Sequence, residues 1–165
     1  MSAPLCFGEG FMDEIKHAAP DALPQKHKRE HPDYEYYRRD FVPREGHGCK
    51  VSIYELPPGK SAYPYHYHTK NEEVFYILSG TGTLKTPAGD RAVSAGEFLF
   101  FPATAAGAHK LTNASETEPL VYIDFDTAND LDAAVYPDSG KIGIWGKGVN
   151  RVFRLEDAVE YYEGE

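Results

Sequence analysis

The chain has 165 residues, of which 41% are hydrophobic and 26% charged, which is typical of one soluble domain with a sizeable core. The formal net charge of −9 disfavours nucleic acid and anionic membrane surfaces as partners. Tyrosine and phenylalanine are frequent, with 12 and 9 copies, and both favour strands. The composition therefore indicates a β-rich fold.

The N-terminal residues lack a basic start followed by a continuous apolar run, so no signal peptide is predicted. No apolar run approaches the roughly 18 residues of a membrane span. We expect a cytoplasmic protein without a membrane partner. Cys6 and Cys49 are interpreted as free thiols, because nothing in a chain of this length requires them to pair.

Residues 1–35 are polar and rich in proline, and they are predicted to be irregular. The aromatic and charged segment 34–41 is expected to be an edge strand, or an arm that lies over the domain or over a neighbouring subunit. His17, His27 and His31 are interpreted as solvated residues of this region.

Residues 49–56 alternate between apolar and polar side chains and form the first clear strand. Further strands are expected at 63–68, 73–78, 81–86, 91–94, 98–101, 109–113 and 120–126, with 98–101 as a buried strand. Beyond them we expect a helical turn within 127–134, a short strand near 142–145 and an amphipathic helix at 154–165. Short strands separated by turn signals favour a sandwich or barrel.

His66 and His68 stand one residue apart, and residues i and i+2 of a strand point to the same face. Glu72 and Glu73 open the following apolar run, so a carboxylate can return beside the two imidazoles. His109 begins a later strand. Imidazole nitrogens and a carboxylate oxygen on a rigid sheet are the ligands of a first-row metal site.

These two stretches resemble the paired motifs of the cupin superfamily. The first motif is matched by Gly59, His66, His68, Glu73 and Gly80, with one extra residue before His66. The second is matched by Gly96, Pro102, His109 and Asn113, although PATAAG stands where the family usually has PxG. The spacing to Gly80 selects Glu73 over Glu72 as the ligand.

The resemblance implies an all-β double-stranded β-helix, the cupin jelly roll. We divide the chain into an irregular N-terminal arm (1–45), a barrel core (46–127) and a short C-terminal extension packed on the barrel (128–165). The segment YPDSGKIGIW and the closing EYYEGE are similar to a group of small bacterial single-domain cupins, some of them labelled sugar-phosphate isomerase-like.

The resemblance also implies one divalent metal ion, with Zn, Mn, Fe, Ni and Co all open, held by His66, His68, Glu73 and His109. Because the imidazoles must be neutral to bind, metal affinity is expected to fall below about pH 6. Strand parity predicts a pocket lined by inward-facing residues, with no cation among them, which weakens the case for a phosphorylated substrate. Those residues are Phe75, Ile77, Leu111 and Asn113.

Such a site fits an isomerase acting on a small hydroxy-carbonyl compound such as a sugar or sugar phosphate. An oxygen-dependent dioxygenase or oxidase, a decarboxylase and a non-catalytic binding module stay open as alternatives. The general base is also open, with Glu72 and the Tyr and Asp residues of the barrel mouth as candidates. Tyr63, Tyr65 and Tyr67 are expected to form an outward stripe, which predicts a homodimer.

Overall fold

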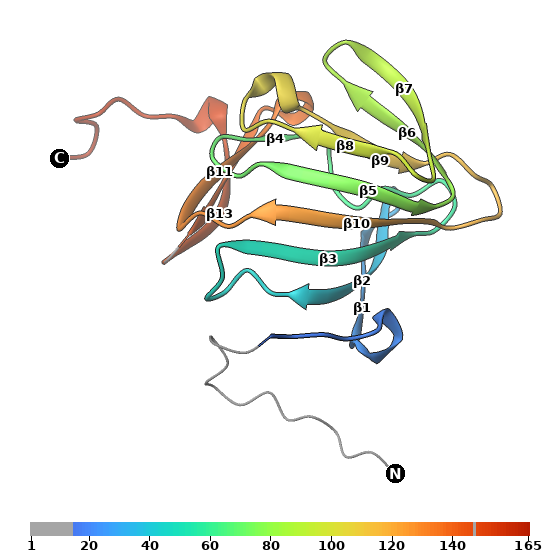
Figure 1. The fold of residues 1–165 in the computed structure, drawn as a ribbon. Helices are drawn as coiled ribbons and strands as arrows, with labels where there is room; N and C mark the ends of the chain where they lie inside the picture. Colours follow the sequence, from blue (N-terminus) through green and yellow to red (C-terminus); the bar gives the residue numbers. More distant parts are fainter. Residues whose placement is uncertain (1–14, 147) are drawn as a thin grey trace.

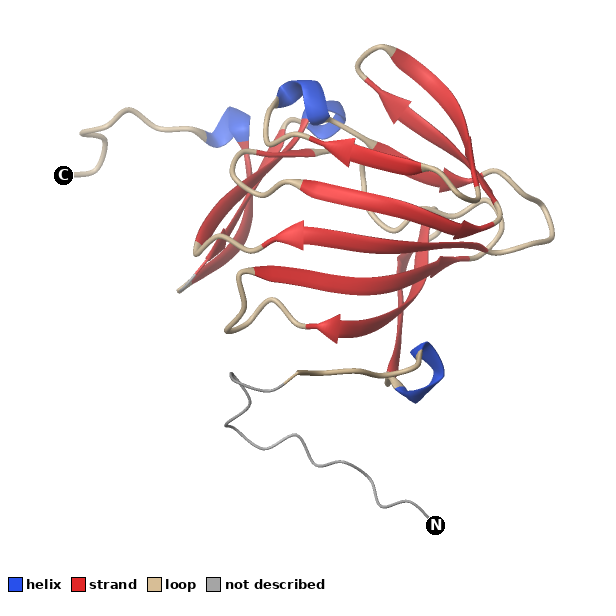
Figure 2. Cartoon of the chain, in the orientation of Figure 1, coloured by secondary structure: helices blue, strands red, loops and turns tan. Residues whose placement is uncertain are grey.

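The computed structural model describes residues 15–146 and 148–165, and strands dominate its regular structure (Figure 1, Figure 2). Six strands form the largest sheet, in the spatial order β1-β2-β3-β10-β5-β8. Their bounds are β1 (Gln25–His31), β2 (Tyr34–Val42), β3 (Cys49–Leu56), β10 (Leu120–Thr127), β5 (Glu73–Ser79) and β8 (Phe98–Phe101). All neighbours in this sheet are antiparallel.

Two smaller sheets complete the fold, with the orders β13-β12-β11-β4 and β7-β6-β9. Their strands are β13 (Val149–Arg154), β12 (Lys141–Gly146), β11 (Leu131–Tyr136), β4 (Tyr67–His68), β7 (Gly89–Ser94), β6 (Thr81–Thr86) and β9 (Lys110–Asn113). The helical elements of the described chain are short 3-10 turns: η1 (Pro20–Ala22), η2 (Ala105–Gly107), η3 (Pro137–Ser139) and η4 (Leu155–Asp157).

The core lies between the inner face of the six-stranded sheet and the sheet of β6, β7 and β9. Alternation along β3 places Ser52, Tyr54 and Leu56 inside, as the period of two requires. The larger sheet contributes Phe75 from β5, and the smaller sheet contributes Leu111 from β9. Two layers that share one apolar interior confirm the all-β jelly roll predicted from the sequence.

Gly80 closes β5 in a conformation that only glycine adopts easily, with φ at +86°. A Cβ atom added there would lie 2.5 Å from the backbone oxygen of Pro119. This close approach explains why the strand that begins at Glu73 ends at a glycine.

The prediction of an irregular segment over residues 1–35 is wrong at residues 25–31, which form β1. The strand predicted at 34–41 is confirmed as β2, although β1 pairs beyond it, so β1 is the edge of the largest sheet. His27 and His31 lie on β1 and are exposed, in agreement with their interpretation as solvated residues. Cys6 lies outside the described residues, and Cys49 is a free thiol.

The segment predicted as the ligand strand, 63–68, is strand only at Tyr67 and His68. The outward tyrosine stripe is therefore also wrong: Tyr65 is 9% exposed, and the hydroxyl of Tyr63 lies 2.9 Å from that of Tyr54 and 3.2 Å from that of Tyr36. Strand β8 is not the buried strand we predicted, since Phe98 and Phe100 are 74% and 59% exposed.

The C-terminal prediction failed in two places. Residues 131–136 form β11 where a helical turn was expected, and the chain after β13 has only the single turn η4 instead of an amphipathic helix. Figure 1 shows this last segment leading away from the sheets. Strand β11 pairs with β4, and β12 and β13 follow beyond β11 in the same sheet, so the C-terminal segment helps to build the region around His68.

In the part of the chain that the structure describes, no helix has the length and apolar character needed to cross a membrane. The cytoplasmic location stays a prediction.

Candidate metal centre

Backbone pairing brings the three motif histidines together from separate parts of the chain. His66 and His109 form an isolated antiparallel bridge, with the amide of His66 3.1 Å from the carbonyl oxygen of His109 and the reverse bond at 2.8 Å. His68 follows on β4, and Glu73 is the first residue of β5. The fold thus gathers all four predicted ligands in one place.

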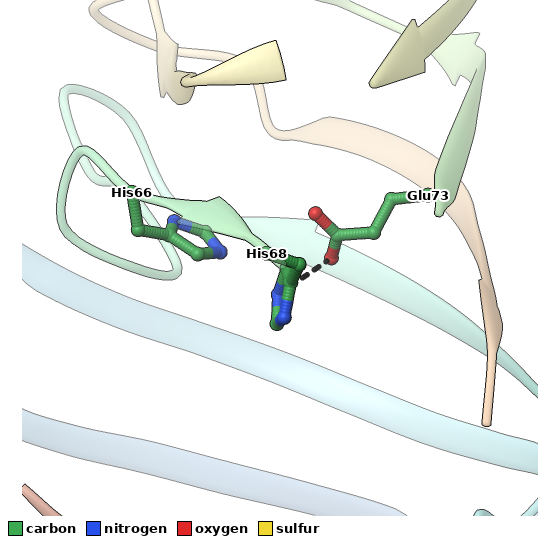
Figure 3. Close-up of side chains that lie close together, drawn as sticks. All are labelled: His66, His68 and Glu73. Atoms are coloured by element: carbon green, nitrogen blue, oxygen red, sulfur yellow. Dashed lines mark ion pairs between the residues drawn. The ribbon is translucent and has the colours of Figure 1, made fainter. Parts of the chain in front are cut away.

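The ligand atoms of His66, His68 and Glu73 lie within 4.8 Å of one another (Figure 3). One oxygen of Glu73 is 3.7 Å from Nε2 of His68, and the other is 3.3 Å from Nε2 of His109. Glu73 is buried and its neighbour Glu72 is exposed, which confirms the strand register predicted from the spacing to Gly80.

Each imidazole is oriented by an acceptor at its Nδ1 atom. His66 Nδ1 lies 2.8 Å from the carbonyl oxygen of Pro64, and His109 Nδ1 lies 2.9 Å from that of Gly107. His68 Nδ1 bonds to the carboxylate of Asp132. Because these oxygens only accept, Nδ1 carries the proton and donates in each ring, and Nε2 keeps its lone pair.

The departure from the usual motif in PATAAG has a structural explanation. The loop folds into η2, which brings Gly107 against Pro102 so closely that an added Cβ would lie 2.1 Å from the Pro102 oxygen. The loop therefore still presents a carbonyl to His109, by way of a glycine five residues after the proline.

Burial determines the protonation state of the two most buried histidines, His66 and His109. It lowers the pKa of His66 to about 4 and that of His109 to about 3, and neighbouring imidazoles add to both effects. Burial would also lower the pKa of His68, but the hydrogen bond to Asp132 and the charge of Glu73 raise it instead. His66 and His109 are thus neutral at physiological pH, the state in which imidazole binds metals.

Glu73 and His109 supply the test of whether the site fits a cation. Within the described chain, neither Oε2 of Glu73 nor Nε2 of His109 has a hydrogen-bond partner, although both atoms are buried. Burial raises the pKa of the Glu73 carboxyl to about 7. Two buried acceptors 3.3 Å apart need a proton or a cation between them, and the ligand atoms of His66 and His68 close by make the donor set fit a metal ion.

A second buried cluster lies beside the first and was missed in the sequence. Lys50 on β3 places its ammonium 2.8 Å from Asp124 and 2.8 Å from Asp126, and Arg44 lies 3.4 Å from Asp126. Lys50 lowers the pKa of Asp126 to about 2 against the opposing effect of burial. Strand parity could have found these residues, because they share faces with Ser52 and Tyr122, which are core residues.

A cavity of about 410 Å³ opens over His66, His68 and Glu73. Tyr63, Tyr136 and Trp145 form part of its wall. Strand parity had assigned no cation to the site, but basic side chains also line this cavity: Lys26, Arg38, Arg44 and Lys50. They alternate with Asp40, Glu45 and Asp126, so the wall is polar and mixed in charge.

The four residues predicted to line the pocket divide into two pairs. Phe75 and Leu111 line a small hollow of about 20 Å³ together with His66, Glu73 and His109. Ile77 lies in the apolar core instead, and the amide of Asn113 donates to the carbonyl oxygens of Leu56 and Glu118. For Ile77 and Asn113 the structure therefore indicates a packing role.

The family model described as the cupin domain matches residues 52–126. This part of the chain is similar to the cupin domain. All four candidate ligands lie within the matched residues, whereas Asp132, Tyr136 and Trp145 lie beyond them. No curated protein matches the chain.

Solved structures extend the similarity over most of the chain. A candidate sugar phosphate isomerase from Acidithiobacillus ferrooxidans is 27% identical with a TM-score of 0.76, over 87% of this chain and 92% of that one. A cupin-superfamily sugar phosphate isomerase from Silicibacter pomeroyi is 17% identical with a TM-score of 0.77, over 89% and 98%. A predicted oxalate decarboxylase from Thermotoga maritima is 19% identical with a TM-score of 0.59, over 69% and 100%. At their identities the last two show the shared fold.

Proposed function

We propose that this cupin is a metal-dependent enzyme that isomerises a small hydroxy-carbonyl substrate, a sugar or sugar phosphate. The observation that carries the proposal is the set of oriented Nε2 atoms and the unpartnered Glu73 oxygen at the floor of an open cavity. His66, His68, Glu73 and His109 would hold one divalent metal. When bound, such an ion polarises a carbonyl and acidifies a neighbouring hydroxyl.

The chain's own residues would bind and orient the rest of the substrate. Trp145 and Tyr136 give the cavity a partly aromatic wall on which the apolar face of a sugar can pack. Arg44 and Lys26 can pair with a phosphate or carboxylate, because guanidinium and ammonium groups donate to anionic oxygens. These cations support the phosphorylated form of the substrate, which the sequence had disfavoured.

Two residues of the cavity can handle protons. Burial raises the pKa of Tyr63, so its phenol stays neutral and can donate a hydrogen bond to a substrate oxygen. Asp126 lines the same cavity and offers an ionised carboxylate within 4.8 Å of Glu73. Glu72, the sequence candidate for the base, is exposed and does not line the cavity.

The similarity to the candidate sugar phosphate isomerase from Acidithiobacillus ferrooxidans supports the same substrate class. The dioxygenase alternative was attractive because an apolar pocket was expected, and the mixed-charge wall of the cavity removes that argument. Turnover assays distinguish an isomerase from the decarboxylase and binding-module alternatives.

The first experiment measures metal content of protein purified without a nickel column, for wild type, Glu73→Ala and Glu72→Ala. We expect the wild type and Glu72→Ala to retain about one equivalent and Glu73→Ala to lose most of it, because only Glu73 faces the imidazoles. Loss from Glu72→Ala with retention in Glu73→Ala would contradict the ligand assignment.

The second experiment follows aldose–ketose interconversion by metal-replete protein, with matched phosphorylated and free sugars, and records oxygen uptake in parallel. We expect interconversion without oxygen uptake, faster with the phosphorylated sugar. Binding without turnover of any substrate would support the binding-module alternative, and oxygen uptake would support the dioxygenase.

A further inference from the structure

The four-stranded sheet turns one of its faces toward the cavity over the metal centre. Side chains that pair directly across antiparallel strands share a face, and Ala134 on β11 pairs with both His68 on β4 and Gly143 on β12. Trp145 stands two residues after Gly143 on the same face and pairs with Asn150 on β13. This face therefore extends from a candidate metal ligand to the only tryptophan of the chain.

The indole of Trp145 lies directly over Gly143. A Cβ atom added to Gly143 would lie 2.7 Å from Cζ2 and 2.9 Å from Nε1 of Trp145, so the ring occupies the space that any other side chain would need. Gly143 is not among the glycines with a positive φ, so the backbone conformation does not require it. A glycine inside a strand weakens the strand. The chain accepts this cost at the position where the absence of a side chain seats the indole.

The indole thereby lies in the same row of the sheet as His68, which is drawn in Figure 3. His68 and Gly143 are two strands apart, and neighbouring strands are about 4.8 Å apart, which gives a separation of about 10 Å. The residue between them is Ala134, whose methyl group leaves the floor of the cavity low. A ligand that contacts both the metal and the indole must bridge this gap.

The length of the gap favours a six-carbon sugar. Carbon atoms joined by bonds of about 1.5 Å span at most about 3 Å in a three-carbon compound and up to about 7 Å in a six-carbon one. A three-carbon substrate that binds the metal therefore falls short of Trp145. A hexose reaches the indole while its carbonyl end is at the metal.

The lining of the cavity matches the hydroxyl groups of a sugar. Hydroxyls both donate and accept hydrogen bonds, and the wall offers basic side chains as donors, Asp40 and Glu45 as acceptors, and the amide of Asn150 as both. The negative face of the Trp145 ring attracts the polarised C–H groups of a sugar ring. A nucleobase could also stack there, but it forms hydrogen bonds only at its edge and would leave many of these groups unpaired.

We propose that Trp145, seated on Gly143, and Asn150 form a recognition site for the ring of a hexose phosphate, and that this site selects six-carbon over three-carbon sugars. The inference rests on the proposed function, because it places the substrate between the metal centre and Trp145. These three residues lie beyond residues 52–126. Selectivity therefore comes from the C-terminal strands and not from the part of the chain that is similar to the cupin domain.

Tryptophan fluorescence of zinc-loaded protein tests the proposal directly, because all of the signal comes from Trp145. The titrants are glucose 6-phosphate, mannose 6-phosphate and fructose 6-phosphate, with glyceraldehyde 3-phosphate and adenosine monophosphate for comparison. We expect at least one hexose phosphate to change the emission and to bind about tenfold or more tightly than the three-carbon compound, which lacks the contact with the ring.

Two variants remove the indole from its seat. Gly143→Ala displaces the ring and Trp145→Leu deletes it, and calorimetry should show hexose phosphate binding weakened about tenfold in both, with glyceraldehyde 3-phosphate unaffected. Gly48→Ala is the matched control, since a Cβ added at Gly48 meets nothing within 4 Å, and it should bind as wild type does. Circular dichroism and metal content establish that each variant is folded. If Gly143→Ala does not fold, Trp145→Leu gives the same comparison.

Wild-type affinity for hexose phosphates in folded Trp145→Leu would overturn the inference and leave Trp145 a packing residue. Binding of no hexose phosphate, or tighter binding of adenosine monophosphate than of all three, would also overturn it. Turnover of a hexose phosphate that does not depend on Trp145 would support the isomerase and contradict the recognition site. Binding that depends on Trp145 without turnover would support the recognition site and contradict the isomerase.

Discussion

Two buried groups of carboxylates lie side by side on the inner face of the largest sheet, and they are balanced differently. Asp124 and Asp126 have their cation built in, because Lys50 lies 2.8 Å from each. Glu73 lies between the imidazoles and Asp126, and its Oε2 atom has no hydrogen-bond partner among the described residues. Lys50 therefore balances the charge of the aspartates in part, although one oxygen of each also lacks a hydrogen-bond partner, and a cation from solution would do the same for Glu73.

The largest effect is expected when the built-in cation is removed. Lys50→Met leaves Asp124 without its cation and Asp126 with Arg44 alone at 3.4 Å, which should lower the free energy of unfolding by about 3–5 kcal/mol in urea titrations. Lys85→Met is the control, since Lys85 makes a comparable pair with Asp138 at the surface and should change stability little. If Lys50→Met has the same free energy of unfolding as wild type, Lys50 does not stabilise the buried aspartates and the contrast with Glu73 is wrong.

Removal of metal by chelation tests the group around Glu73. Chelation should lower the unfolding free energy of wild type by about 2.7 kcal/mol where free metal had been 100-fold above its dissociation constant. The same treatment should leave the stability of His109→Ala unchanged, because that variant lacks a ligand. Equal stabilisation of His109→Ala by metal would place the ion elsewhere, with Asp124 and Asp126 as the first candidates.

Asp132 connects the C-terminal sheet to the metal centre, and its effect should be smaller. It accepts from His68 and from the backbone amides of Lys70 at 2.9 Å and Asn71 at 3.3 Å. Asp132→Asn should weaken metal binding about 10–100-fold in competition with a chromogenic chelator, because the orientation of His68 is lost. Asp138→Asn, at the surface, should bind as wild type does.

The dependence on pH should be the mildest effect and should differ from the sequence expectation. Burial raises the pKa of Glu73 to about 7 and lowers those of His66 and His109 to about 4 and 3. The pKa of His68 is raised as well, so as pH falls Glu73 and His68 are the first ligands to take up protons that compete with metal, and affinity should decrease by up to about tenfold per pH unit below pH 7. A dissociation constant that stays flat from pH 7 to pH 6 would contradict this order of titration.

Much of the fold was accessible from local patterns. The strands at 49–56 and 81–86 were predicted with the bounds that the structure gives, because alternation and turn residues mark both ends. The edge strand β1 was not, because residues 25–31 are polar throughout and exposed and have no apolar alternation to reveal the strand. The 154–165 helix failed for the opposite reason, since an apolar pattern existed but nothing packs against it.

The sequence by itself determined the order of the four candidate ligands and the inward register of Glu73, because motif spacing and the period of two are local properties. The ligand role of those residues stays a prediction. Only the tertiary structure decided that Lys50 is paired across to β10, that Asp132 reaches His68 from β11, and that cations line the cavity. Parity tells which face a side chain occupies, whereas strand order, set by pairing between distant segments, decides which side chains share that face.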